Sequence, residues 1–154
     1  MQNSNQTISA LEDHLGFWLR TVSNQVSLRF KQQLEQHDIS VAEWVAMRSL
    51  YQSTDSTHAL LMNSLGFTKG ATSKIITKLE EKQLITRHHQ DGNLRNQIIQ
   101  LSNKGNQLTP ILAQIADEND HFFFGKLSRQ QQQQLKQLMH LLVTENHISE
   151  IATQ

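Results

Sequence analysis

Lysine and small hydroxyl residues are concentrated in the stretch Thr68–Lys78, which is the part of the sequence best suited to binding an anionic partner. Lysines neutralise phosphates, and serine and threonine hydroxyls hydrogen-bond to phosphate oxygens and to base edges. A helix beginning here would add backbone N–H donors and a positive dipole end. Gly70 leaves room for close approach of the backbone to a ligand. The candidate DNA-contacting residues of this stretch are Thr68, Lys69, Gly70, Thr72, Ser73, Lys74, Thr77 and Lys78.

A helix over Lys69–Lys82 is expected to present these side chains. Its predicted buried face is Ala71, Ile75, Ile76 and Leu79. A short helix with Leu60, Leu61 and Leu65 on its inner face precedes it and ends at Gly66. Two helices joined by Gly66-Phe67 predict a helix-turn-helix.

The apolar period then changes to two, which predicts a β-hairpin. Its expected strands are Leu84–His89 and Asn96–Leu101, with Asp91-Gly92 in the connection. Arg87 adds a further candidate DNA contact on this hairpin. A hairpin that follows a helix-turn-helix is typical of a winged helix.

Longer helices are predicted on both sides of this unit. One covers the first part of the chain, and Ser40 with Glu43 forms a capping box that opens a second. After the hairpin, Ser102 opens a helix that Pro110 should bend or delay, and Ser128 opens the last one. The predicted fold class is therefore mainly α with a small β-hairpin wing (α+β), a winged helix-turn-helix joined to a helical dimerisation region.

The expected division places the winged DNA-binding unit at 37–102 and the helical region at 1–36 and 103–154. Long amphipathic helices cannot bury their apolar stripes against a complete small domain. We expect them to pack with each other and with a second copy of the chain. A monomeric helical bundle beside the winged unit is the alternative.

Composition excludes several other classes of function. The 154 residues include no cysteine, which excludes a disulfide framework and a thiol switch. No membrane span, secretion signal or catalytic motif is recognisable, so we expect a cytoplasmic protein that is not an enzyme, with no membrane partner. The eight histidines form no paired ligand spacing, so we expect neither a metal nor another cofactor.

Three segments carry a resemblance to a known family: Leu65–Lys74, Leu79–Ile85 and Leu101–Gly105. With the wing between them, they resemble the MarR family of bacterial winged helix-turn-helix transcription regulators. The resemblance implies double-stranded DNA as a partner and a homodimer formed through the first and last two helices. It also implies a wing tip of Asp-Arg-Arg, which falls here on Asn93, Leu94 and Arg95. Arg95 is then the minor-groove contact, without its usual acidic neighbour.

The resemblance further implies a small-molecule effector, often aromatic, bound where the first, second and fifth helices meet. Trp18, Arg20 and Trp44 are the candidate pocket residues, since flat rings beside a cation suit an aromatic acid. Both tryptophans also fit structural roles, Trp18 in the apolar stripe and Trp44 in a hydrophobic staple.

We therefore expect a dimeric, sequence-specific repressor that binds a pseudo-palindromic operator and is released by an effector. An effector-independent, anti-silencing activator is the alternative, and a winged-helix module that binds proteins is another. The net charge of zero does not argue against DNA, because Thr68–Lys104 holds seven basic and three acidic residues. This segment therefore carries a local charge of +4, which the remainder of the chain balances.

Overall fold

The computed structural model describes residues 8–90 and 93–148, with the backbone alone for residues 90 and 93–96. A short 3-10 turn, Leu11–Asp13, precedes the first helix. The helices are α1 (Leu15–Glu35), α2 (Val41–Leu50), α3 (His58–Leu65), α4 (Lys69–Glu81), α5 (Asn103–Phe124) and α6 (Arg129–Glu145), and the strands are β1 (Ile85–Gln90) and β2 (Asn93–Leu101). This order and the mainly α fold class confirm the predictions.

The core lies where α2, α3 and α4 pack against each other and against the base of the hairpin. Its largest fully buried side chains include Met47, Leu50, Leu65, Ile76 and Leu79. Each such side chain contributes about 1.5–3 kcal/mol on leaving water. This core holds α4 in a fixed orientation.

Local hydrogen bonds set where the helices begin. The backbone N–H of Ser40 donates to Glu43 Oε2 at 2.7 Å, and the Glu43 N–H donates to Ser40 Oγ at 3.2 Å. The predicted capping box of α2 is thus confirmed. Hydroxyls of Thr68, Ser102 and Ser128 cap α4, α5 and α6 in the same way.

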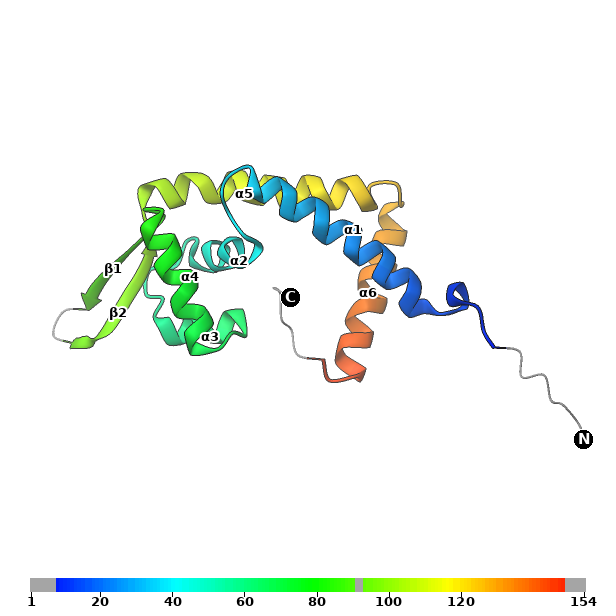
Figure 1. Ribbon diagram of the computed structural model, residues 1–154, viewed down its shortest axis with the longest axis horizontal. Coiled ribbons are helices and arrows are strands. Elements are labelled where there is room, and N and C mark those ends of the chain that lie inside the picture. Colours follow the sequence, from blue (N-terminus) through cyan, green and yellow to red (C-terminus); the bar gives the residue numbers. More distant parts are fainter. Residues whose placement is uncertain (1–7, 91–92, 149–154) are drawn as a thin grey trace, which may run out of the picture.

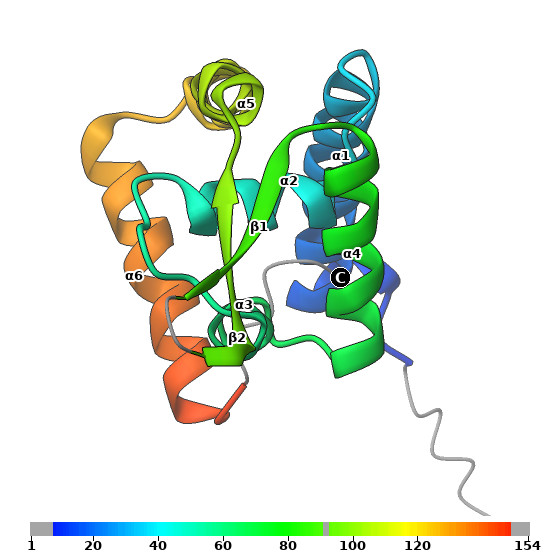
Figure 2. The same cartoon turned by 90° about the vertical axis from the view of Figure 1, so that its left-hand side faces the viewer.

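The hairpin is antiparallel and longer than predicted. Its register runs from Ile85 opposite Leu101 to His89 opposite Gln97, and Gln90 then pairs with Asn93. The predicted start of the second strand at Asn96 was therefore wrong, because the strand begins at Asn93. Figure 2 shows the hairpin beside α4, against which β1 packs.

Helix α5 begins directly after Ser102, so Pro110 does not delay it. Its first turn lies against the chain that enters β1, and a Cβ atom on Gly105 would meet the Leu84 carbonyl oxygen at 2.1 Å. The Ser102 N–H donates to the same carbonyl at 2.9 Å. A glycine is required here by the close approach of two backbones.

Helix α5 spans the molecule from the winged unit to α6, with α1 packed along part of it (Figure 1). The described structure contains no buried residue in α6, and Leu138 there is 60% exposed. Apolar side chains in the first half of α1 are exposed as well, including Leu15, Leu19 and Val22. Over the described residues, no helix combines the length and the apolar character needed to cross a membrane.

Candidate nucleic-acid interface

One face of α4 anchors it in the core. Thr72, Ile75, Ile76 and Leu79 are buried, at the spacing i, i+3, i+4 and i+7. Thr72 is 0% exposed, and its hydroxyl donates to the Thr68 carbonyl oxygen at 3.0 Å. Thr72 was predicted to contact DNA, but in this structure it is not part of the exposed surface of α4. Its helical spacing from the three apolar residues was the signal that placed it in the core.

The opposite side of α4 is exposed and carries the other predicted contacts. We call this surface the recognition face, and it consists of Lys69, Gly70, Ser73, Lys74, Thr77 and Lys78. Its lysines form no salt bridge within the described parts of the chain. Nothing lies within 4 Å of the position that a Gly70 Cβ atom would occupy. Thr68 is exposed at the start of the helix, where its hydroxyl accepts a bond from the Ala71 N–H at 3.2 Å.

A residue outside α4 reaches the recognition face. His58, the first residue of α3, has its Nε2 atom 2.9 Å from Ser73 Oγ. Sequence reasoning did not find His58, because fifteen positions separate the two residues and no local pattern joins them.

Lys82, directly after α4, points away from this surface. Its ammonium group binds the buried carboxylate of Glu43 at 3.0 Å and lies 3.6 Å from Asp38 Oδ2. Part of the positive charge counted between Thr68 and Lys104 is therefore already balanced inside the protein.

The hairpin contributes differently from the helix. Arg87 of β1 forms a salt bridge with Glu80 of α4, so this predicted DNA contact has an acidic partner. Arg95 lies in β2, but its side chain falls outside the described residues, as do those of Asn93 and Leu94. His88 and His89 are adjacent and exposed on β1. In the part of the chain that the structure describes, no group of three histidine or acidic residues could hold a metal ion.

A cavity of about 570 Å³ lies between α1, α2 and α5. Its lining includes Trp44, one of the predicted pocket residues, together with Phe30 and Lys31. Trp18 and Arg20, the other two predicted pocket residues, do not line it. Both lie in the first half of α1, and the Trp18 indole N–H donates to the Glu12 carbonyl oxygen at 2.8 Å.

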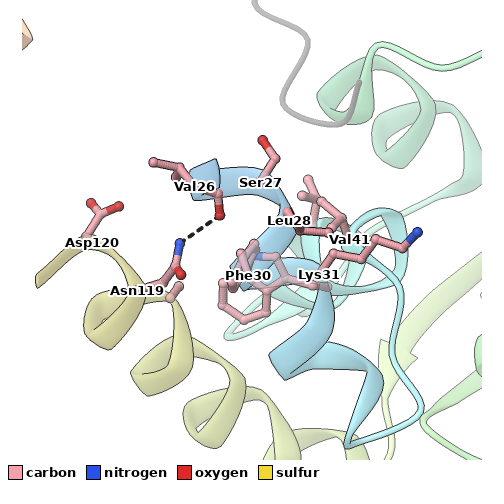
Figure 3. Close-up of a pocket in the computed structure, with 11 residues that line it drawn as sticks. Val26, Ser27, Leu28, Phe30, Lys31, Val41, Asn119 and Asp120 are labelled. Atoms are coloured by element: carbon pink, nitrogen blue, oxygen red, sulfur yellow. Dashed lines mark hydrogen bonds between the residues drawn. The ribbon is translucent and has the colours of Figure 1, made fainter. Parts of the chain in front are cut away.

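The cavity is mainly apolar, with polar groups at its margins (Figure 3). Phe30 and Trp44 form an edge-to-face pair with ring centroids 6.5 Å apart. The buried Asn119 amide donates to the Val26 carbonyl oxygen at 3.1 Å and accepts a bond from Arg29 at 2.9 Å, which joins α5 to α1. In Figure 3 the Lys31 ammonium and the Asp120 carboxylate lie at opposite ends of the row of labelled residues that line the cavity.

Comparisons with known proteins agree with this architecture. The transcriptional regulator HosA of Escherichia coli O127:H6 is 23% identical over 130 residues, which cover 84% of this chain and 95% of HosA. The crystal structure of the Staphylococcus aureus MepR–DNA complex gives a TM-score of 0.76 at 24% identity, over 86% of this chain and 98% of MepR. The structure of a Mycobacterium tuberculosis MarR family protein in complex with salicylic acid gives a TM-score of 0.65 at 22% identity. The match covers 84% of this chain and 96% of that protein.

The match to a known family lies in the winged unit. Residues 39–96, which hold the helix-turn-helix and most of the hairpin, match the MarR family model. The curated relatives are named as transcriptional regulators, and the solved neighbours share the winged-helix fold. Residues 39–96 therefore match the MarR family, and over most of its length the chain is similar to transcriptional regulators that are solved with the same fold.

Proposed function

We propose that this chain is a homodimeric, sequence-specific DNA-binding regulator that acts as a repressor in the cytoplasm. The recognition face is the observation that carries the proposal. It combines Lys69, Lys74 and Lys78 with exposed hydroxyls on a helix whose other side is fixed in the core. Lysines would position the helix on phosphates while hydroxyls contact base edges in the major groove. The MepR–DNA complex, which shares the fold, supports double-stranded DNA as the partner.

A salt titration of DNA binding tests this proposal. The logarithm of the association constant should fall linearly with the logarithm of salt concentration, with a slope near −0.9 for each phosphate neutralised. A flat response would contradict it and favour a winged-helix module that binds proteins.

Arg95→Ala should weaken binding most at A·T-rich flanks, because a wing arginine reads the narrow minor groove.

Dimerisation is supported by the apolar side chains that α1, α5 and α6 leave exposed. They include Leu15, Leu19, Ile111, Phe122, Leu138, Leu141 and Leu142. A second copy packed on these helices would bury them and bring two winged units together. The two recognition helices would then enter successive major grooves about 10 bp apart on a pseudo-palindromic operator.

Sedimentation equilibrium measures the association state. Wild type should behave as a dimer, and Leu138→Glu with Leu142→Glu should shift it to monomer, because a glutamate resists desolvation in an apolar interface. Gln133→Glu on the same helix is the control for added charge. A monomeric wild type would contradict the proposal.

The cavity between α1, α2 and α5 supports a small aromatic effector. Phe30 and Trp44 offer ring faces, and Lys31 offers a cation for a carboxylate. A relative with this fold binds salicylic acid, which has that chemistry. An effector would release DNA only if it bound more tightly to a dimer whose winged units are spaced differently.

Titration with salicylate tests the proposed effector site. In a Trp18→Phe variant Trp44 is the remaining tryptophan, and its fluorescence should be quenched when salicylate binds. Adding Lys31→Met should weaken salicylate binding and therefore shift this quenching to higher salicylate concentrations. Salicylate should also displace operator DNA. If DNA binding were unchanged by ligand, and transcription rose only when a silencing protein was present, an effector-independent anti-silencing activator would be the correct assignment.

A further inference from the structure

Ser73 lies on the recognition face, yet its hydroxyl is bonded to a side chain from another helix. The His58 Nε2 atom is 2.9 Å from Ser73 Oγ. Ser73 is exposed and His58 is partly exposed, so the pair lies on the surface that α4 would present to DNA. Any bond that Ser73 makes to DNA must be compatible with the bond to His58.

The backbone beside His58 is fixed to two further elements. Thr57 caps α3 by accepting the Leu60 N–H at 3.3 Å, and it forms a bridge with Ile98 of β2. The Ser56 carbonyl oxygen accepts the Ile99 N–H at 2.7 Å. His58 therefore follows a segment that is bonded to the base of the wing, and its imidazole joins α3 to α4 at Ser73.

The bond to the ring decides what the Ser73 hydroxyl offers outward. A serine hydroxyl has one hydrogen and two lone pairs. If Nε2 accepts that hydrogen, Ser73 faces DNA as an acceptor, suited to the amino groups of adenine and cytosine. If Nε2 carries a hydrogen, Ser73 accepts it and can donate to guanine O6 or N7 or thymine O4. One group outside α4 thus sets the hydrogen-bonding role of a residue on the recognition face.

We propose that His58 is a positioning residue that determines specificity, because it fixes whether Ser73 acts as donor or acceptor toward a base. The proposal rests on the DNA-binding function proposed above. His58 would act through Ser73, and a direct contact between its ring and a phosphate is the alternative that the experiment must separate.

Selection from a randomised duplex DNA pool tests the proposal with the full-length chain. Wild type first defines a consensus duplex, and its affinity is then compared with that for a scrambled duplex at fixed salt. His58→Ala and Ser73→Ala should lose discrimination at the same base position, with the ratio of the two affinities falling about fivefold or more. The double variant should lose no more than Ser73→Ala alone, because each change removes the same bond.

His58→Gln is the conservative variant, since its amide can either donate to Ser73 or accept from it. It should restore discrimination at that position, which a merely structural role for the ring does not predict. Thermal unfolding of every variant by circular dichroism checks that the fold is retained. If His58→Ala unfolds, His58→Phe takes its place, because a phenyl ring keeps the bulk of the side chain and offers Ser73 no hydrogen bond. Unchanged discrimination in His58→Phe would overturn the proposal.

Three further results would overturn it. His58→Ala could select the wild-type consensus with an unchanged affinity ratio. Equal losses on consensus and scrambled DNA, with a shallower salt slope, would show a phosphate contact instead. Additive losses in the double variant would show two independent contacts. A wild-type chain that selected no motif would refute the DNA-reading function itself, which distinguishes the two failures.

Discussion

Lys82 holds the buried carboxylate of Glu43, with its ammonium nitrogen 3.0 Å from Oε1 and 3.1 Å from Oε2. The Glu43 side chain is 3% exposed, and the same carboxylate also accepts the Ser40 N–H. Asp38 adds its backbone carbonyl oxygen as an acceptor for the Lys82 ammonium. The end of the recognition helix is thereby attached to the first turn of α2 and to the turn before it.

Removing the lysine should therefore destabilise the fold. Lys82→Met leaves Glu43 buried without its cation, and we expect a loss of about 1–3 kcal/mol, reduced from the fully buried case because Lys82 is partly exposed. Urea unfolding measures this loss. In the double variant with Glu43→Gln, which retains the capping group, the loss should be smaller than the sum of the single losses. Additive losses would contradict an energetic coupling between the two residues.

Lys78 and Lys82, one helical turn apart, should differ in DNA binding. Lys78 is exposed on the recognition face, whereas Lys82 is engaged with Glu43. In the proposed dimer Lys78→Met removes one phosphate contact from each subunit, so it should reduce the magnitude of the salt slope by about 1.8, and Lys82→Met should leave it unchanged. Mobility shifts at several salt concentrations give both slopes. Equal changes would mean that Lys82 exchanges its internal partner for a phosphate.

Two threonines of α4 provide a test of which face meets DNA. Thr72 is buried and Thr77 is exposed. Thr72→Val retains the shape of the side chain and should leave operator affinity unchanged, at a stability cost of about 0.5–1.5 kcal/mol for the lost hydroxyl bond. Thr77→Val should weaken operator binding without that stability loss. The opposite pattern would mean that α4 rotates when DNA binds.

The sequence predicted features that depend on near neighbours. The Ser40–Glu43 capping box and the helix starts after Ser102 and Ser128 follow from residues a few positions apart, and they are confirmed. The partnership of Glu43 with Lys82 could not be predicted, because thirty-nine positions separate the residues. The orientation of Thr72 was predictable from helical spacing, but its hydroxyl suggested a polar role.

The residues that line the cavity could be predicted only in part from the sequence. A pocket between the first, second and fifth helices was implied by family resemblance, and the cavity found there is lined by Trp44, one of the three predicted pocket residues. Which turn of α1 reaches the cavity depends on how α1 packs against α2 and α5. Phe30 and Lys31 lie there, about three turns beyond the predicted Trp18 and Arg20.

Gly70 should separate fold stability from DNA binding. A methyl group has open space there in the free protein, and alanine is favoured over glycine in helices by up to about 1 kcal/mol. Gly70→Ala should therefore leave the free energy of unfolding unchanged or raise it. It should weaken DNA binding if the DNA backbone approaches this helix start closely, as the proposed docking requires. Unchanged operator affinity would show that Gly70 does not face the DNA backbone.

Gly105 should behave in the opposite way, because its Cβ position is occupied by the Leu84 carbonyl oxygen at 2.1 Å. Gly105→Ala would have to move the start of α5 away from the hairpin base, and we expect a loss of about 1–3 kcal/mol despite alanine's higher helix propensity. Gly16→Ala is the matched control, since nothing lies within 4 Å of its Cβ position in α1. Urea unfolding of the two variants measures the difference. Equal stability would mean that α5 shifts at little cost, and the junction between α5 and the wing would then be compliant rather than fixed.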